Sequence, residues 1–164
     1  MTLIKVQYKR RRENKTDYVA RRKMLEGDIP RIVIRKTNRY IIAELVKSKE
    51  AQDSVICSVN SKELIKYGWP NSFSIKNLPA CYLTGFLLGK KIKEKNNEKA
   101  ILDIGLIRST KGNKIYAVLK GVLDAGINVA HSEEILPEEK RILGSHINEK
   151  IKDQFEKTKS GIGK

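Results

Sequence analysis

Basic side chains gather in two clusters near the N-terminus, and such side chains bind phosphate. Eight of the eighteen residues from 8 to 25 are Lys or Arg. Guanidinium groups bind phosphate oxygens in bidentate fashion, and such contacts fix how a protein lies on a nucleic acid. The first cluster comprises Lys9, Arg10, Arg11, Arg12 and Lys15, and the second comprises Arg21, Arg22 and Lys23.

Neighbouring residues suggest how these clusters would meet RNA. If Thr16 caps a helix from Asp17 onward, Arg21 and Arg22 project about one turn beyond Tyr18. From there they could contact the two phosphate backbones on either side of an RNA groove. Tyr8 and Tyr18 could stack on an unpaired base or sugar. We therefore interpret residues 1–28 as a basic RNA-binding arm that stays disordered until RNA neutralises it. The alternatives are a solvated charged arm and a membrane-surface anchor, which the lack of a large apolar face disfavours.

The stretch STKGNK, residues 109–114, is a second candidate phosphate contact. It lies where a predicted strand gives way to a predicted helix, and the N-terminus of a helix presents free N–H groups to an oxyanion. Gly112 lets the backbone approach closely, and Lys111 and Lys114 add full charges. The spacing is not that of a Walker loop, so nucleotide hydrolysis is unsupported. Taken alone, the pattern fits a plain turn as well as a phosphate contact.

No residue pattern supports an enzyme, a metal site or a cofactor. Asp103 lies inside an apolar stretch without partner carboxylates nearby, and His131 and His146 stand alone. Cys57 and Cys81 are too far apart for metal-ligand spacing, so we expect two buried thiols in a reducing compartment. We also expect neither a membrane span nor a signal peptide, and hence an intracellular chain that is soluble or part of a soluble assembly.

The overall charge supports a polyanionic partner. The 164-residue chain has a formal net charge of +15, and residues 1–48 contribute 14 basic against 5 acidic side chains. Residues 133–164, in contrast, carry 7 of each sign. A basic surface without a function remains the alternative, but it would not explain why the charge is concentrated at one end.

The elements that must position these residues follow from hydrophobic periodicity. Residues 31–36 and 39–46 are rich in β-branched residues and predict a hairpin around Thr37 and Asn38, with residues 54–59 as a third strand. Residues 60–78 are expected to form a long loop that can include one helical turn.

A βαβ unit is predicted in the second half of the chain. A helix should start near Pro79 and end near Lys95; its Gly85 and Gly89 suit close packing on the sheet better than a close approach by RNA. A strand over 99–107 precedes an amphipathic helix that ends at Gly126, and residues 127–130 form a short strand.

A final helix is predicted from Pro137, with Leu143, Ile147, Ile151 and Phe155 on one apolar face and a loose tail from Glu156. This order of elements fits an α/β protein, a three-layer α/β/α domain with a mixed sheet and an extended basic N-terminal arm. The expected divisions are the arm over 1–28, the α/β body over 29–132, and the C-terminal helix and tail over 133–164.

Several segments together resemble one family, the large-subunit ribosomal protein called L-eighteen in bacteria and archaea and L-five in eukaryotes. The similar stretches are RRRENKTDYVARRKML, TNRYIIAEL, KELIKYGW, LPACYLTGFLLGKK and LDIGLIRSTKGNKIYAVLKGVLDAG, in the family's order over roughly residues 8–130. The long basic arm resembles the archaeal branch. Residues after 132 are the part to which the resemblance extends least.

The resemblance implies a ribonuclease-H-like layered fold without catalysis, and a cytoplasmic location in the large ribosomal subunit. It also implies a place in the central protuberance, with 5S rRNA, 23S rRNA and neighbouring ribosomal proteins as partners and no small-molecule substrate. By position it assigns RNA contact to Arg10, Arg11, Arg12, Lys15, Thr16, Tyr18, Arg21 and Arg22. It adds, as a second tier, Asn38, Arg39, Arg108, Thr110, Lys111, Asn113 and Lys114.

Two rival hypotheses remain open at this point. A metal-dependent nuclease on the same layered fold would shorten RNA in the presence of Mg²⁺ or Mn²⁺. A basic protein-interaction module outside the ribosome would not sediment with large subunits in high salt.

Overall fold

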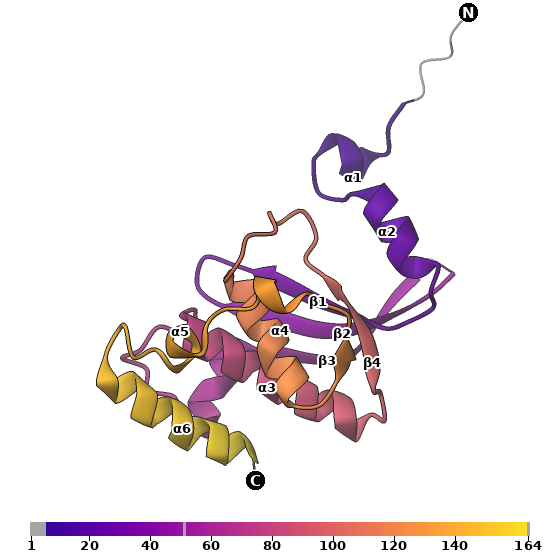
Figure 1. Ribbon diagram of the computed structural model, residues 1–164. Helices are drawn as coiled ribbons and strands as arrows, with labels where there is room; N and C mark the ends of the chain where they lie inside the picture. Colours follow the sequence, from indigo (N-terminus) through magenta and orange to yellow (C-terminus); the bar gives the residue numbers. More distant parts are fainter. Residues whose placement is uncertain (1–5, 51, 164) are drawn as a thin grey trace, which may run out of the picture.

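The computed structural model describes residues 6–50 and 52–163, and its centre is a mixed five-stranded sheet (Figure 1). The strand order is β3-β2-β1-β4-β5. Strand β1 pairs antiparallel with β2 and parallel with β4, and β5 continues the parallel half. The strands are β1 Arg31–Lys36, β2 Ile41–Lys49, β3 Gln52–Asn60, β4 Lys99–Asp103 and β5 Asn128–Val129.

The helices lie before, between and after these strands. Every described helix is too short or too polar to cross a bilayer. The α-helices are α1 Lys9–Arg12, α2 Tyr18–Leu25, α3 Leu78–Glu94, α4 Lys114–Asp124, α5 Glu139–Leu143 and α6 Glu149–Gly163, and the 3-10 helices are η1 Ser61–Tyr67 and η2 Glu133–Ile135.

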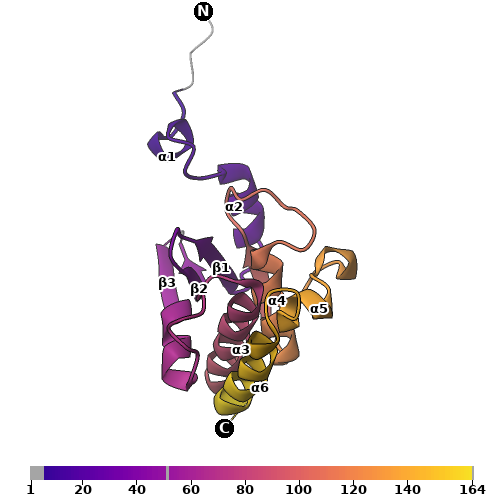
Figure 2. The same cartoon turned by 90° about the vertical axis from the view of Figure 1, so that its left-hand side faces the viewer.

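Helices α3 and α4 pack side by side against the same face of the sheet, and α5 and α6 pack on α3 (Figure 2). The core between the sheet and the helix pair is mainly apolar, with Ile32, Ile34 and Leu45 contributed by the strands and Leu83 and Leu119 by the helices. The mixed sheet is confirmed, but the expected α/β/α order, with helix layers on both faces, is wrong. The second face carries Arg31, Arg35, Glu44 and Asp103, and such side chains cannot be buried under an apolar helix.

Three glycines let α3 and α4 approach each other closely. A Cβ atom on Gly85 would overlap the carbonyl oxygen of Val118, and one on Gly121 would overlap that of Tyr82. A Cβ on Gly89 would overlap the Cβ of Ala125. Close packing therefore explains these glycines, as expected, but the partner of Gly85 and Gly89 is helix α4 rather than the sheet.

The predicted boundaries of α3 and α4 are confirmed to within a few residues. Asn77 caps α3 by accepting a hydrogen bond from the Ala80 N–H at 2.9 Å, and Pro79 occupies the first turn. Helix α4 ends before Gly126, whose φ of +93° is left-handed.

Three local predictions in the body are confirmed in kind but wrong in their bounds. The predicted tight hairpin between β1 and β2 is present, but the central residues of its turn are Asn38 and Arg39 rather than Thr37 and Asn38. Thr37 and Tyr40 close the turn: the Thr37 N–H donates to the Tyr40 carbonyl, and the Tyr40 N–H donates to the Thr37 hydroxyl. The helical part of the 60–78 segment is longer than the single turn expected, because residues 61–67 form helix η1, which is held by a capping box between Asn60 and Glu63. Strand β4 ends at Asp103, where Gly105 turns the chain with φ +62°.

The C-terminal segment also differs from the prediction. The single helix expected from Pro137 is broken at Gly144, which has φ +77°, so α5 and α6 are separate and Ile147 is half exposed. The tail expected to be loose from Glu156 is helical to Gly163 and buries Thr158 and Ile162. Two buried positions one turn apart continue the apolar face of Ile151 and Phe155.

Candidate nucleic-acid interface

The basic arm contains two short helices that project from one end of the sheet (Figure 1). Asp17, rather than Thr16, caps α2, because its carboxylate accepts hydrogen bonds from Val19 N–H at 2.9 Å and Ala20 N–H at 3.2 Å. Thr16 instead accepts a hydrogen bond from Arg10 Nε at 2.8 Å. This bond ties α1 to the start of α2, so both halves of the arm have defined local structure.

Most basic side chains of the arm face solvent. Arg22 is 83% exposed and pairs with Glu26 at 3.1 Å, and Lys15 pairs with Glu13 at 2.9 Å. Such exposed pairs contribute little stability, so these cations are available to a phosphate. The other exposed basic residues of the arm are Lys9, Arg10, Arg11, Arg12 and Lys23.

The two arm tyrosines contact each other. The ring centroids of Tyr8 and Tyr18 are 5.0 Å apart with the planes tilted by 44°. Tyr8 is 71% exposed and has an open outer surface, whereas Tyr18 is half buried. The pair therefore offers one aromatic surface on which a base could stack.

Arg21 is the exception among the basic residues of the arm. Its two terminal nitrogens donate to the two carboxylate oxygens of Asp53 in β3, both at 2.9 Å, and its side chain is only 26% exposed. The bond to Asp53 raises the pKa of Arg21 against the effect of its partial burial. Burial of Asp53 raises its pKa, but the bonds from Arg21 and Ser48 and the charge of Arg31 outweigh this and hold it at about 2. The pair is therefore fully ionised at neutral pH.

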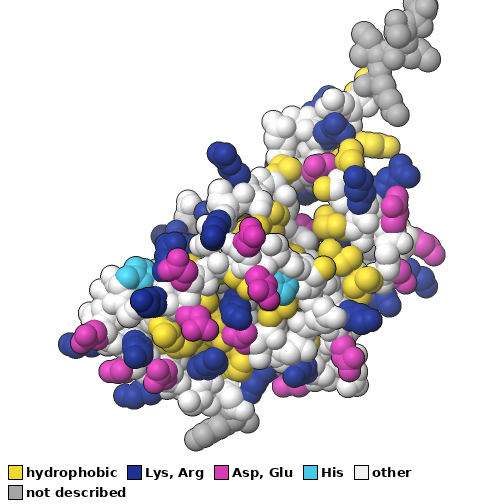
Figure 3. Space-filling view, viewed as in Figure 1, with side chains coloured by type: hydrophobic (Ala, Val, Ile, Leu, Met, Phe, Trp, Pro, Cys, Tyr) yellow, Lys and Arg dark blue, Asp and Glu magenta, His cyan; other side chains and the backbone are white. Residues whose placement is uncertain are grey.

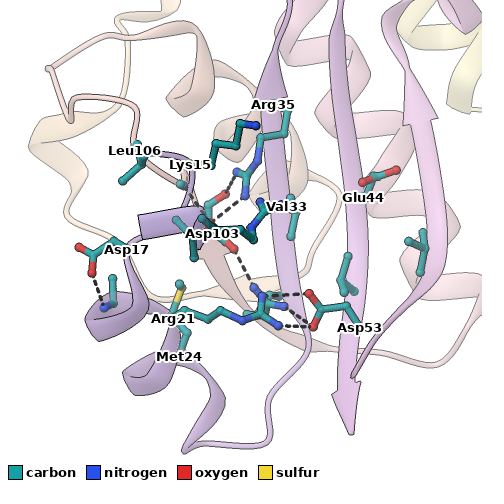
Figure 4. Close-up of a pocket in the computed structure, with 17 residues that line it drawn as sticks. Lys15, Asp17, Arg21, Met24, Val33, Arg35, Glu44, Asp53, Asp103 and Leu106 are labelled. Atoms are coloured by element: carbon teal, nitrogen blue, oxygen red, sulfur yellow. Dashed lines mark hydrogen bonds and ion pairs between the residues drawn. The ribbon is translucent and has the colours of Figure 1, made fainter. Parts of the chain in front are cut away.

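A buried ion pair lies directly behind Asp53. Arg31 in β1 is 3% exposed; it donates to Asp53 at 2.9 Å, to the Ser48 hydroxyl at 3.1 Å and to Asp103 at 2.8 Å. Its Nε is buried without a partner among the described residues. Strands β1, β3 and β4 are thus joined by one set of charges on the open face of the sheet (Figure 4).

Asp103 has structural partners for its carboxylate. Besides Arg31, it accepts hydrogen bonds from Arg35 at 3.3 Å and from the Gly105 N–H at 2.8 Å. Across residues 6–50 and 52–163, no three His, Cys, Asp or Glu side chains come together in a way that could hold a metal ion. A carboxylate paired with two arginines supports the turn after β4 and gives the nuclease hypothesis no support.

A groove of about 320 Å³ separates the arm from the open face of the sheet (Figure 4). Its lining on the sheet side includes an apolar patch made of Val33, Val46 and the 55%-exposed Val55. Its polar walls include Arg10 and Lys15 from the arm and, from the body, Arg31, Arg35, Glu44, Asp53 and Asp103.

The loop between β4 and α4 is more constrained than its sequence suggested. The Gly112 N–H donates to the Ile135 carbonyl at 3.0 Å and the Asn113 N–H to that of Thr110 at 3.2 Å, so neither amide is free for an oxyanion. The Asn113 side chain bonds Thr110 at 3.3 Å and does not cap α4. Arg108 and Lys111 are exposed, whereas Lys114 is half buried in the first turn.

The hairpin residues lie at the far end of β1 from the arm. Asn38 and Arg39 are exposed in the four-residue turn, and the Lys76 ammonium donates to the Asn38 carbonyl at 2.6 Å. The arm and the start of the β4–α4 loop are neighbours, since both line the groove, whereas the hairpin is a separate basic site. In Figure 3 Lys and Arg side chains lie over the arm end and the loop together with some Asp and Glu side chains, and the C-terminal helices also carry both signs.

Sequence reasoning missed the residues that hold the arm to the body. Asp103 and Arg31 were noticeable in the sequence as charged residues within apolar strands. Arg31, Val33 and Arg35 are every second residue of β1 and so share one of its faces. Asp53 gave no signal, because an acidic residue near a strand end is ordinary on a solvated edge.

Comparison with known proteins assigns the chain to a family. The family model described as "Ribosomal large subunit proteins 60S L5, and 50S L18" matches residues 3–99 and 93–132. The curated large ribosomal subunit protein uL18 of Korarchaeum cryptofilum is 56% identical over 143 residues, which are 87% of this chain and 72% of that protein. The uL18 protein of Methanoregula boonei is 46% identical over 90% of this chain and 86% of its own length, and that of Methanosphaera stadtmanae is 50% identical over 87% and 73%.

These relatives are ribosomal proteins and not enzymes, and large ribosomal subunits reside in the cytoplasm. The matched residues include the whole arm except its first two residues, together with the body. The expected family is therefore confirmed: the chain belongs to the large-ribosomal-subunit proteins of the L5 and L18 family.

Proposed function

We propose that this protein binds 5S rRNA, chiefly through the basic arm, and helps attach it to 23S rRNA in the central protuberance of the large subunit. The observation that carries the proposal is the arm itself, which projects exposed basic residues from a folded body. Neighbouring ribosomal proteins are the further partners, and the near-neutral C-terminal segment offers them a surface of mixed charge.

The mechanism is architectural. Arm cations displace condensed counterions from folded RNA, so affinity should fall steeply as salt rises. With 6 to 10 phosphate contacts the expected loss between 50 and 200 mM salt is about a thousandfold or more. The Tyr8 ring and the valines of the groove would supply contacts to unstacked bases, so specificity would come from RNA shape rather than from a helical sequence code. The β4–α4 loop residues Arg108 and Lys111 and the hairpin residues Asn38 and Arg39 are secondary contacts.

Binding to a 5S rRNA transcript tests the proposal. The full chain should bind it tightly in about 100 mM salt and should prefer it to a tRNA of similar size and charge. A chain lacking residues 1–27 should fold normally and bind much more weakly, since the body keeps its own core. Equal affinity for both RNAs, or full affinity without the arm, would contradict the proposal. Footprinting of 5S rRNA with the two chains would then identify the nucleotides that only the arm protects.

A further inference from the structure

Helix α2 has few means of staying on the body. It buries none of its residues, and its neighbouring arginines point in different directions. The Arg22 side chain is 83% exposed on the solvent side, whereas that of Arg21 is 26% exposed and is directed at the sheet. Figure 4 shows Arg21 reaching from α2 to Asp53 on β3. Within the part of the chain that the structure describes, this bidentate pair is the side-chain hydrogen-bonded contact that joins the arm to the body.

The acceptor of this contact is held rigidly. Asp53 receives hydrogen bonds from Arg31 and from Ser48 as well as from Arg21. Arg31 is in turn fixed by Asp103, which is 6% exposed. Because these partners come from β1, β2 and β4, the carboxylate has one orientation, and the guanidinium of Arg21 must adopt the matching one.

We infer that Arg21 is a positioning residue that anchors α2 through Asp53, so that the other basic residues of the arm are presented to RNA in a fixed arrangement. Arg21 then contacts no phosphate, although the sequence placed it with the phosphate-binding cluster. The inference rests on the proposed function. It has an unusual consequence, because the acidic residue Asp53 then contributes to the affinity for a polyanion.

Two physical effects oppose each other at Asp53. A carboxylate beside the RNA interface repels phosphate, so its removal alone would strengthen binding. Loss of the anchor frees the arm, and RNA must then order it at an entropic cost. Because Asp53 is already neutralised by two arginines, the repulsion is small and the ordering cost should dominate.

The neighbouring arginines provide a matched pair of variants. Arg21→Ala and Arg22→Ala each remove one guanidinium from the same helix, and both should weaken 5S rRNA binding. The slope of log affinity against log salt should fall by about 1 for Arg22→Ala, because a phosphate contact is lost. The slope for Arg21→Ala should equal that of the unmodified protein. A slope reduced equally in both variants would overturn the inference, because Arg21 would then be a phosphate ligand.

A variant of Asp53 tests the inference through the direction of its effect on RNA binding. Asp53→Asn should weaken 5S rRNA binding by about fivefold, whereas Glu44→Gln, which removes a charge from the same groove without an arm contact, should not weaken it. The double variant Arg21→Ala with Asp53→Asn should lose no more than Arg21→Ala alone, since the two residues act through one contact. Unchanged or tighter binding by Asp53→Asn, or additive losses in the double variant, would overturn the anchor.

Hydrogen exchange of the free protein tests the anchor independently of the proposed function, because no RNA is present. Amides of residues 18–25 should exchange several times faster in Arg21→Ala than in the unmodified protein, while those of α3 stay unchanged. Equal exchange in α2 would overturn the anchor whether or not RNA binds. If the unmodified protein ignored 5S rRNA, the proposed function would fail, and faster exchange in the variant would still support the anchor.

Discussion

Helices α2 and α6 lie near opposite ends of the chain and are attached to the body by opposite means. Helix α6 buries Ile151, Phe155, Thr158 and Ile162, and the Phe155 ring lies 5.3 Å from that of Tyr82. Helix α2 fully buries no residue, although Met24 and Leu25 are half buried, and its polar contact with the body is the ion pair of Arg21 and Asp53. Apolar attachment depends weakly on salt and pH, whereas attachment by half-exposed charges depends on both.

The difference matches the two roles that we assign. A segment of balanced charge that packs on the body can be permanent, because it needs no exchange of partners. An arm that must meet RNA keeps its cations in solvent, and α2 fully buries none of its residues. One ionic contact orients such an arm and leaves the rest of its surface free.

The largest predicted effect is on α6. Phe155→Ala should lower the free energy of unfolding by about 3 to 5 kcal/mol, because it opens a cavity between α6 and Tyr82. Urea denaturation followed by circular dichroism measures this change. Ile147→Ala, at a half-exposed position in the same segment, is the control and should change stability by less than about 0.5 kcal/mol. A mild effect at Phe155 would mean that α6 is attached as loosely as α2.

Salt should affect the two attachments differently. At 1 M salt the Debye length is about 3 Å, so the half-exposed pair of Arg21 and Asp53 is screened. We expect the amides of α2 to exchange several times faster than at 50 mM salt, and those of α6 to keep their protection. Measurement by NMR at both salt concentrations tests this, and equal responses of the two helices would remove the contrast.

Elements whose signal is local were predictable from the sequence. Pro79 and Asn77 mark the start of α3, and the apolar stripe from Ile115 to Leu123 specifies α4. The break at Gly144 was missed because the apolar spacing of Leu143, Ile147 and Ile151 runs through it, although Ile147 faces solvent in the structure. Periodicity cannot distinguish one bent helix from two.

The site was predictable only in part. The positions of the arm cations followed from composition, because exposed charge needs no partner. The role of Arg21 did not, since its partner Asp53 lies 32 residues away and only strand pairing brings the two together. The same reasoning covers Arg31 and Asp103, which are separated by 72 residues. Long-range ion pairs leave no periodic trace in a sequence.

Acid should release the arm before it affects α6. Asp53 has a folded-state pKa of about 2, below its ordinary 3.8, so the ionised carboxylate favours the docked arm. This contribution is fully present above about pH 3.8 and is lost as the pH falls toward 2. NMR titration of the Asp53 carboxyl carbon should give a midpoint near 2, and Arg21→Ala should move it upward. If the titration midpoint of Asp53 is the same in Arg21→Ala as in the unmodified protein, the two side chains do not pair in solution.

The smallest predicted effect concerns Arg21 and the body. Arg21→Ala should change the free energy of global unfolding by less than about 0.5 kcal/mol, because Asp53 keeps Arg31 and Ser48 as partners and the lost contact is partly exposed. Urea denaturation followed by the fluorescence of the buried Trp69 reports on the body alone. A loss of several kcal/mol would show that α2 and the core unfold as one cooperative unit. In that case the arm would be part of the domain rather than a segment attached to it, and its arginines could not be varied independently of the fold.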